Sequence, residues 1–221
     1  MADLPSNVAA LGPYLHGAAT TLSVAALAAV CGLAVGLALL ALLQSRRPVL
    51  RWIVRIYTSF VRGTPLLVQI FLIYYALPGL LRIDMPAYAA GVLALSLNSG
   101  AFVVEILRGA LSAIAKGQHE AAQALGLPPF VAWRHVIAPQ LLRHALAPML
   151  NELTMLVKAS ALLSVITVVE LTRVAQNTMN TTFRPVEAFV TAGAFYFLIL
   201  FALASLARAL ERRLQIGRAH V

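Results

Sequence analysis

From residue 18 to residue 43 the chain carries no charged side chain at all. As a helix this run would be about 39 Å long, at 1.5 Å per residue, so it would cross the hydrocarbon layer with a tilt. Four further, mostly apolar runs follow, at residues 64–81, 87–107, 145–169 and 188–210. We therefore expect an all-α integral membrane protein of about five transmembrane helices.

The composition excludes most other classes of protein. Charged residues make up 11% of the chain and hydrophobic residues 61%, whereas about a quarter of a soluble domain is charged. Five spans leave no room for a separate catalytic domain, so we expect a single transmembrane domain over residues 1–215. Cys31 is the only cysteine, and the five histidines lack metal-ligand spacing. We expect no metal site and no cofactor.

Basic residues are distributed unequally between the connections. A set of thirteen lies at residues 44–63, in and beside the connection after residue 107, and at the C-terminus. The other connections hold three, namely Arg82, Arg173 and Arg184. The positive-inside rule assigns the larger set to the cytoplasm, which predicts the N-terminus outside and the C-terminus inside. The net charge of +9 thus reflects orientation in the membrane, and we expect no nucleic-acid partner.

The predicted cytoplasmic stretch Gly117–Pro139 differs from an ordinary connection. Residues 118–125 can form a short alanine-rich helix, with Glu120 in the first turn, where a carboxylate interacts favourably with the helix dipole. Gly126 suits the left-handed conformation that ends many helices, and two prolines follow it. A second short helix is expected over residues 130–138. On these residues alone, the stretch is either a docking element for a partner or an interfacial helix that joins two spans.

Several short motifs occur along the chain in a fixed order. The central ones are Glu120-Ala121-Ala122, Gly126 and, nine residues later, Val136-Ile137-Ala138-Pro139. The others are residues 60–67 (Phe-Val-Arg-Gly-Thr-Pro-Leu-Leu), 98–102 (Asn-Ser-Gly-Ala-Phe), Glu105, Arg108, Gly109, Gly117-Gln118, Asn151-Glu152 and residues 158–170. The central motif resembles the EAA loop of bacterial ABC-importer permeases, although Val136 and Ala138 replace its usual Ile and Leu. The whole set, over residues 17–213, resembles the polar amino-acid branch of that family.

The resemblance implies a function and a set of partners. It implies a permease in the bacterial inner membrane, in contact with lipid, that works with a second permease copy or a sister permease. It also implies two ATPase subunits and an extracytoplasmic binding protein that delivers a polar amino acid. The residues expected to couple to the ATPase are Gly117, Glu120, Ala121, Ala122, Gly126 and Pro139. The chain lacks a phosphate loop of its own, so we expect no enzyme activity and assign ATP hydrolysis to the partners.

Polar residues inside the expected spans are candidates for the substrate pathway, because each is costly in hydrocarbon unless it faces protein or water. The candidates are Asn98, Ser99, Asn151, Glu152, Thr154, Lys158 and Ser160. Asn151, Thr154 and Lys158 share one helical stripe at three- and four-residue steps. The alternative is that Lys158 pairs with a carboxylate such as Glu105 or extends to the membrane surface.

Two expectations concern the third span. Asn98-Ser99-Gly100 is expected to break or bend the helix, since such breaks are tolerated where protein or a cavity satisfies the backbone. Glu105 and Arg108, three residues apart, are expected to form a local ion pair.

A secondary amino-acid transporter or channel without an ATPase partner is the alternative function. Such a protein is expected to contain internal repeats with paired broken helices, and the sequence shows no repeat.

We further hypothesise that residues 216–221, Ile-Gly-Arg-Ala-His-Val, are not native. They equal one reading frame of a common sequencing-adapter sequence, and a short native basic tail is the alternative.

Overall fold

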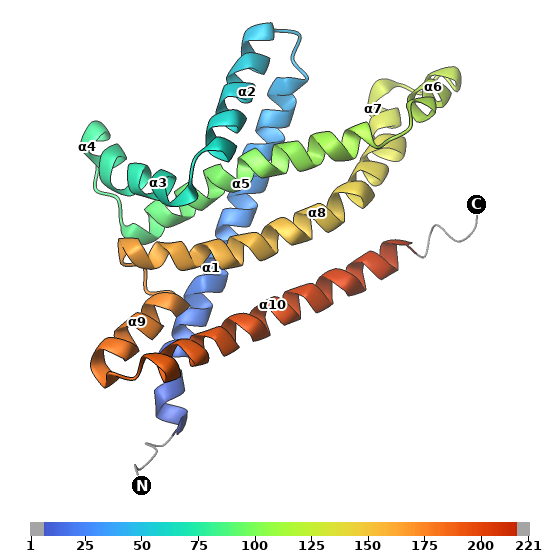
Figure 1. Ribbon diagram of the computed structural model, residues 1–221. Coiled ribbons are helices and arrows are strands. Elements are labelled where there is room, and N and C mark those ends of the chain that lie inside the picture. The colour runs from blue at the N-terminus through green and yellow to red at the C-terminus, as the bar shows by residue number, and fades with distance from the viewer. Residues whose placement is uncertain (1–6, 216–221) are drawn as a thin grey trace.

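The computed structural model describes residues 7–215 of the chain, with side chains over residues 11–212 (Figure 1). Residues 216–221, which we hypothesise are not native, lie outside the described residues. Helices and no strands are present in the described part. The elements in chain order are α1 (Asn7–Leu43), α2 (Pro48–Gly63), α3 (Leu66–Phe71), η1 (Leu72–Ala76), α4 (Leu77–Leu81), α5 (Ala87–Ser112), α6 (Lys116–Ala124), α7 (Pro129–Ala132), η2 (Trp133–Ile137), α8 (Ala138–Ala159), η3 (Ser160–Ile166), α9 (Leu171–Thr182) and α10 (Pro185–Gln215).

Four helical segments within the described part are long and apolar enough to cross a membrane, and a bent pair raises the number to five. The four are residues 11–43, 87–112, 129–166 and 185–212. The pair consists of α2 and residues 66–81, which meet at a bend of 110°. The prediction of about five spans is confirmed. The expected span at residues 64–81 forms one arm of this bend, built from α3, the π-helical turn η1 and α4, and α2 forms the other arm.

The predicted break at Asn98-Ser99-Gly100 is wrong, because α5 continues through it without interruption. Gly100 serves close packing instead. A Cβ atom on this glycine would lie 2.5 Å from Val35 Cγ1, so only a residue without a side chain lets α1 and α5 approach this closely. The same holds in the other direction, since a Cβ on Gly36 of α1 would lie 2.4 Å from Val103 Cγ1.

Pro139 also fails to end a helix, contrary to the expected separate helix over residues 130–138. The π-helical turn η2 precedes it, and the N–H of Ala138 donates to the carbonyl oxygen of Trp133. Pro139 therefore lies in the first turn of α8, where no helical donor is required of it. The helical course runs from residue 129 to residue 166, with η3 as its final 3₁₀ part.

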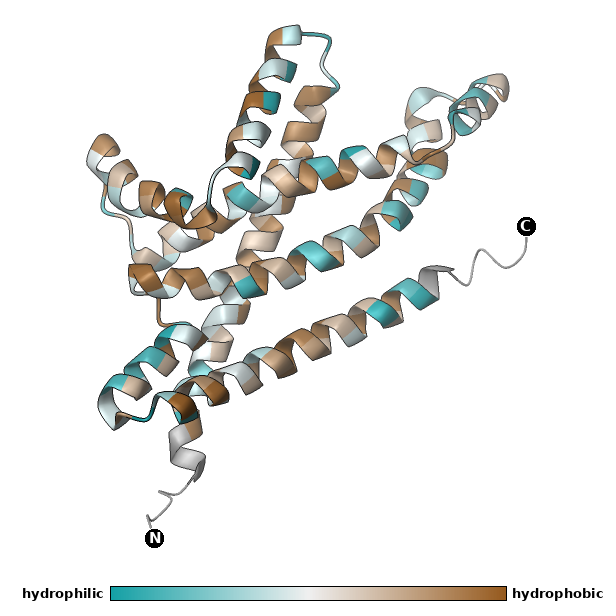
Figure 2. Ribbon diagram, in the orientation of Figure 1, coloured by the Kyte–Doolittle hydropathy of each residue, from teal (hydrophilic) through white to brown (hydrophobic). Residues whose placement is uncertain are grey.

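Two buried clusters mark the two ends of the bundle. At one end, Leu40 of α1 packs with Leu107 of α5 and Leu141 of α8. We call this the α6 end, because it carries α6, α7 and the connection from α1 to α2. At the other, the α9 end, Tyr14 and Leu171 pack with Ala192 of α10. Figure 2 shows hydrophilic residues gathered on α6, on α9 and along the last part of α10.

Helix α9 was not predicted from the sequence. It begins after Glu170, a fully buried residue whose carboxylate accepts hydrogen bonds from the backbone N–H groups of Thr172 (2.9 Å) and Arg173 (2.7 Å). The same carboxylate accepts a hydrogen bond of 2.7 Å from Tyr196 Oη of α10. Burial raises the pKa of the Glu170 carboxyl, and these hydrogen bonds act in the opposite direction. Glu170 thus caps α9 and joins it to α10.

Candidate functional site

Helix α6 projects from the bundle as an exposed element. It begins at Lys116 and ends at Ala124, close to the predicted 118–125. Gly117, Glu120 and Ala121 are exposed, whereas Ala122 is buried with 4% of its surface accessible. An exposed helix with one small residue turned inward leaves most of its surface free to contact another molecule.

The end of α6 has the glycine conformation that the sequence predicted. Gly126 has a φ of 66°, in the left-handed region. The N–H of Gly126 donates to the carbonyl oxygen of Gln123 (2.9 Å). The N–H of Leu127 donates to the carbonyl oxygen of Ala122 (3.1 Å). No atom lies within 4 Å of the position that a Cβ on Gly126 would occupy. A side chain here would therefore strain the backbone and clash with nothing.

The contacts between α6 and the rest of the chain are few. One side-chain hydrogen bond joins Gln118 Oε1 to Gln140 Nε2 at 3.2 Å. Below the helix is a small cavity of about 190 Å³, walled by Ala122, Trp133 and Ile137 among others. Leu125 and Phe130 are 77% and 70% exposed. Apolar side chains this exposed, beside a helix held by few contacts, fit a surface that is covered by a partner.

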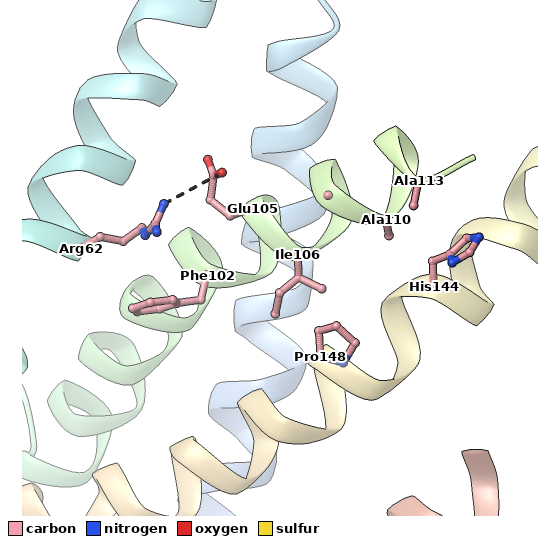
Figure 3. Close-up of a pocket in the computed structure, with 9 residues that line it drawn as sticks. Arg62, Phe102, Glu105, Ile106, Ala110, Ala113, His144 and Pro148 are labelled. Atoms are coloured by element: carbon pink, nitrogen blue, oxygen red, sulfur yellow. Dashed lines mark ion pairs between the residues drawn. The ribbon is translucent and has the colours of Figure 1, made fainter. Parts of the chain in front are cut away.

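A charged cluster lies where α2 ends beside α5. Glu105 accepts a hydrogen bond from Arg108, which confirms the expected local pair. Arg62 joins it from α2, with Nη1 3.9 Å from Glu105 Oε2 and its guanidinium 5.9 Å from the centre of the Phe102 ring. Figure 3 shows Arg62 extended toward Glu105 at the rim of an open pocket of about 460 Å³, whose far wall comes from His144 and Pro148 of α8.

Gln69 holds the bend between α2 and α3, and sequence reasoning missed it. This buried side chain donates from Nε2 to the carbonyl oxygens of Val61 (2.8 Å) and Thr64 (3.2 Å) and to Thr64 Oγ1 (2.9 Å). Its Oε1 accepts a hydrogen bond of 3.0 Å from Asn98 Nδ2 of α5. Beside it, Tyr57 Oη of α2 donates to the carbonyl oxygen of Leu97. The available signal was a lone glutamine in an apolar run.

The predicted pathway residues of α8, and Ser160 at the start of η3, lie on different faces. Asn151 and Lys158 are exposed and Thr154 is half-buried, so the stripe faces away from the chain's own core. Ser160 is fully buried and donates to the carbonyl oxygen of Val157 at 2.8 Å, so it does not belong to the stripe. Within the described residues, no carboxylate lies within 4 Å of Lys158 Nζ, and the alternative pairing with Glu105 is not formed.

The two predicted pathway residues of α5 lie apart from this stripe. Asn98 faces Gln69. Ser99 faces α1, and its hydroxyl is buried without a hydrogen-bond partner among the described residues. The acidic residue next to Ser99 is Glu152 of α8, which is half-buried. Nowhere in residues 11–212 do three or more histidine, cysteine or carboxylate side chains form a group that could hold a metal ion.

Comparisons with known proteins connect this geometry to a family. Residues 17–216 match the family described as binding-protein-dependent transport system inner membrane component. The arginine transport system permease protein ArtQ of Bacillus subtilis is 36% identical over 214 residues, which cover 96% of this chain and 97% of that protein. A putative glutamine transport system permease protein of Rickettsia typhi is 34% identical over 203 residues, with 92% and 93% covered. A crystal structure of an amino acid ABC transporter with histidines superposes with a TM-score of 0.88 at 35% identity, covering 96% of this chain and 99% of that one.

Proposed function

Because the chain belongs to the family of binding-protein-dependent transport system inner membrane components, we propose that it is the permease subunit of an ATP-driven importer for polar amino acids. Members of this family are transport components rather than catalytic enzymes. Relatives named for arginine and for glutamine support the substrate class. The chain is a multi-pass protein of the bacterial inner membrane.

The observation that carries the proposal is the exposed, glycine-ended helix α6. Its outward surface includes Gly117, Glu120 and Ala121, and Leu125 follows at its end. Two ATPase subunits on a pair of permeases would each receive one such helix. The buried Ala122 packs α6 against the bundle, and the exposed Pro139 lies in the first turn of the long helix α8.

The exposed stripe of α8 supports a second permease subunit. Lysine inside a span costs several kcal/mol in lipid, whereas a protein or water-filled surrounding removes much of that cost. We assign Asn151, Thr154 and Lys158 to a surface shared with a second copy or a sister permease, where the substrate passes. On the side that faces the chain's own core, this surface is supported by Asn98, Ser99, Glu152 and Ser160.

The two ends of the bundle differ in the way that an importer requires. The α6 end holds most of the basic residues, and the positive-inside rule assigns it to the cytoplasm. The α9 end then faces outward, where α9 and the start of α10 would receive the amino-acid-binding protein.

The test is reconstitution of the chain with an ATPase subunit and a binding protein from the same organism. We expect uptake of labelled arginine or glutamine that requires ATP and the binding protein. Glu120→Lys should lower both co-purification of the ATPase and uptake. Glu211→Lys, the same charge change on α10, should lower neither. Uptake driven by an ion gradient without ATP would support the secondary transporter instead.

A further inference from the structure

The exposed face of α2 combines arginine with large apolar side chains. Val54, Thr58 and Val61 form its buried face. Around the start of the helix, the exposed residues are Arg46, Arg47, Val49, Arg51, Trp52 and Arg55. Further along, Ile56 and Phe60 are 46% and 53% exposed. The exposed face therefore carries its arginines and tryptophan, with Val49 and Ile53 beside them, over the first half of α2, and Ile56 and Phe60 follow before Arg62 at the far end.

Within residues 11–212, the arginines at the start of α2 form no ion pair with an acidic side chain. Residues 44–63 contain no aspartate or glutamate. Among the ion pairs of the described residues, one involves α2, and it joins Arg62 at the far end of that helix to Glu105. Four guanidinium groups within ten residues, from Arg46 to Arg55, thus leave their charge uncompensated by the chain. A surface of this kind is complementary to an anion.

The side chains also form a site of suitable shape. Arg51 and Arg55, one helical turn apart, line a shallow hollow of about 620 Å³ with Val49 and Trp52. Guanidinium groups bind phosphate oxygens in pairs of hydrogen bonds. Tryptophan favours the boundary between headgroups and hydrocarbon. Along α2 the basic and aromatic residues Arg51, Trp52 and Arg55 come first and the apolar Ile56 and Phe60 follow, which matches the order of headgroup and acyl chain in a phospholipid.

We propose that the first half of α2 binds the headgroup of an anionic phospholipid in the leaflet at the α6 end. Arg51 and Arg55 contact the phosphate, Trp52 lies between them at the headgroup boundary, and Ile56 and Phe60 contact the acyl chains. The lipid is favoured over a soluble phosphate compound because the basic hollow continues into an exposed apolar surface. The proposal does not depend on the transported substrate.

The chain contains two tryptophans, so a direct test is available. In a Trp133→Phe background, Trp52 is the only fluorophore of its kind. Quenching of Trp52 by bromine-labelled phosphatidylglycerol is compared with quenching by bromine-labelled phosphatidylcholine, for the full chain in mixed micelles. Two arginines near an anionic lipid correspond to a preference of roughly 10- to 30-fold for phosphatidylglycerol. Raising the salt concentration should reduce this preference without changing the quenching by phosphatidylcholine.

Arg51→Gln/Arg55→Gln should bring the preference to within about twofold of unity. The matched control is Arg208→Gln/Arg212→Gln, which removes two exposed arginines at the same spacing on α10 and should keep the preference. Equal quenching by both lipids in the Trp133→Phe chain would overturn the proposal, and so would an equal loss in the control. Displacement of phosphatidylglycerol by millimolar inorganic phosphate would overturn it in favour of a free-phosphate site. Displacement by a purified ATPase subunit would assign the surface to that partner.

Discussion

Replacement of Gln69 by leucine tests whether one side chain holds the bend between α2 and α3. The two amide hydrogens of Gln69 serve acceptors at the end of α2, and its oxygen accepts from Asn98. Gln69→Leu therefore removes four hydrogen bonds and leaves the Val61 and Thr64 carbonyls and the Asn98 amide without these partners. At about 0.5–1.5 kcal/mol for each bond, partly offset by the apolar leucine, we expect a loss of about 2–4 kcal/mol in unfolding free energy.

Unfolding in mixed micelles with increasing dodecyl sulfate, followed by circular dichroism, measures this loss. Asn98→Leu supplies the second arm of a double-mutant cycle. Each single substitution strands the other amide, so the double variant should be about 1 kcal/mol more stable than the sum of the single losses predicts. Spin labels at Ser59 and Leu80, in a Cys31→Ala background, should report a broader distance distribution in Gln69→Leu. Additive losses, or an unchanged distribution at the bend, would refute this account of Gln69.

Four further outcomes are expected. Gly126→Val should abolish uptake while the protein stays inserted in the membrane, because a β-branched residue at positive φ costs at least about 1–2 kcal/mol. Gly126→Asn should still transport, because asparagine tolerates that conformation. Glu170→Ala should lower the unfolding free energy by about 2–4 kcal/mol in dodecyl sulfate titration, and by more than Glu170→Gln, which keeps one acceptor. Lys158→Met should lower uptake without lowering ATPase co-purification; normal uptake would remove Lys158 from the pathway. Reporter fusions after Arg47 should score cytoplasmic and those after Asp84 extracytoplasmic, and a cytoplasmic score at Asp84 would contradict the five-span topology.

The spans could be predicted because hydrocarbon imposes a rule on every residue of a crossing helix. Residues 18–43 contain no charge, and α1 covers them completely. Helix α9 does not obey that rule. Its buried residues are only Leu171, Val174 and Ala175, and its start depends on Glu170, whose bond to Tyr196 spans 26 positions in the chain. A short helix fixed by a distant partner leaves little trace in local periodicity.

The errors at Gly100 and Pro139 have a common cause. Both residue types interrupt helices when only neighbouring residues are considered, and both are accommodated here by tertiary or backbone context. Gly100 fits against Val35 of α1, and Pro139 follows a π-helical turn. The left-handed Gly126 was predicted correctly because the requirement for glycine there is local.

The residues predicted to line the pathway do not share one face, for a similar reason. Helical spacing correctly grouped Asn151, Thr154 and Lys158 on one face. Spacing alone could not reveal that Ser160 bonds to its own helix or that Asn98 is occupied by Gln69. Polarity in a span shows that a side chain needs a partner, and the identity of that partner depends on how the helices pack.

The uninterrupted helical course from residue 129 to residue 166 has a mechanical consequence. Its first turns lie against α6, and its last turns pack beside α1 and α3. Pro148 removes one hydrogen bond without ending the helix. A force applied to α6 therefore acts on one continuous, curved helical segment of 38 residues rather than on helices joined by loops (Figure 1). The bend between α2 and α3 is held by the hydrogen bonds of Gln69, so it forms a fixed corner beside the last turns of that segment.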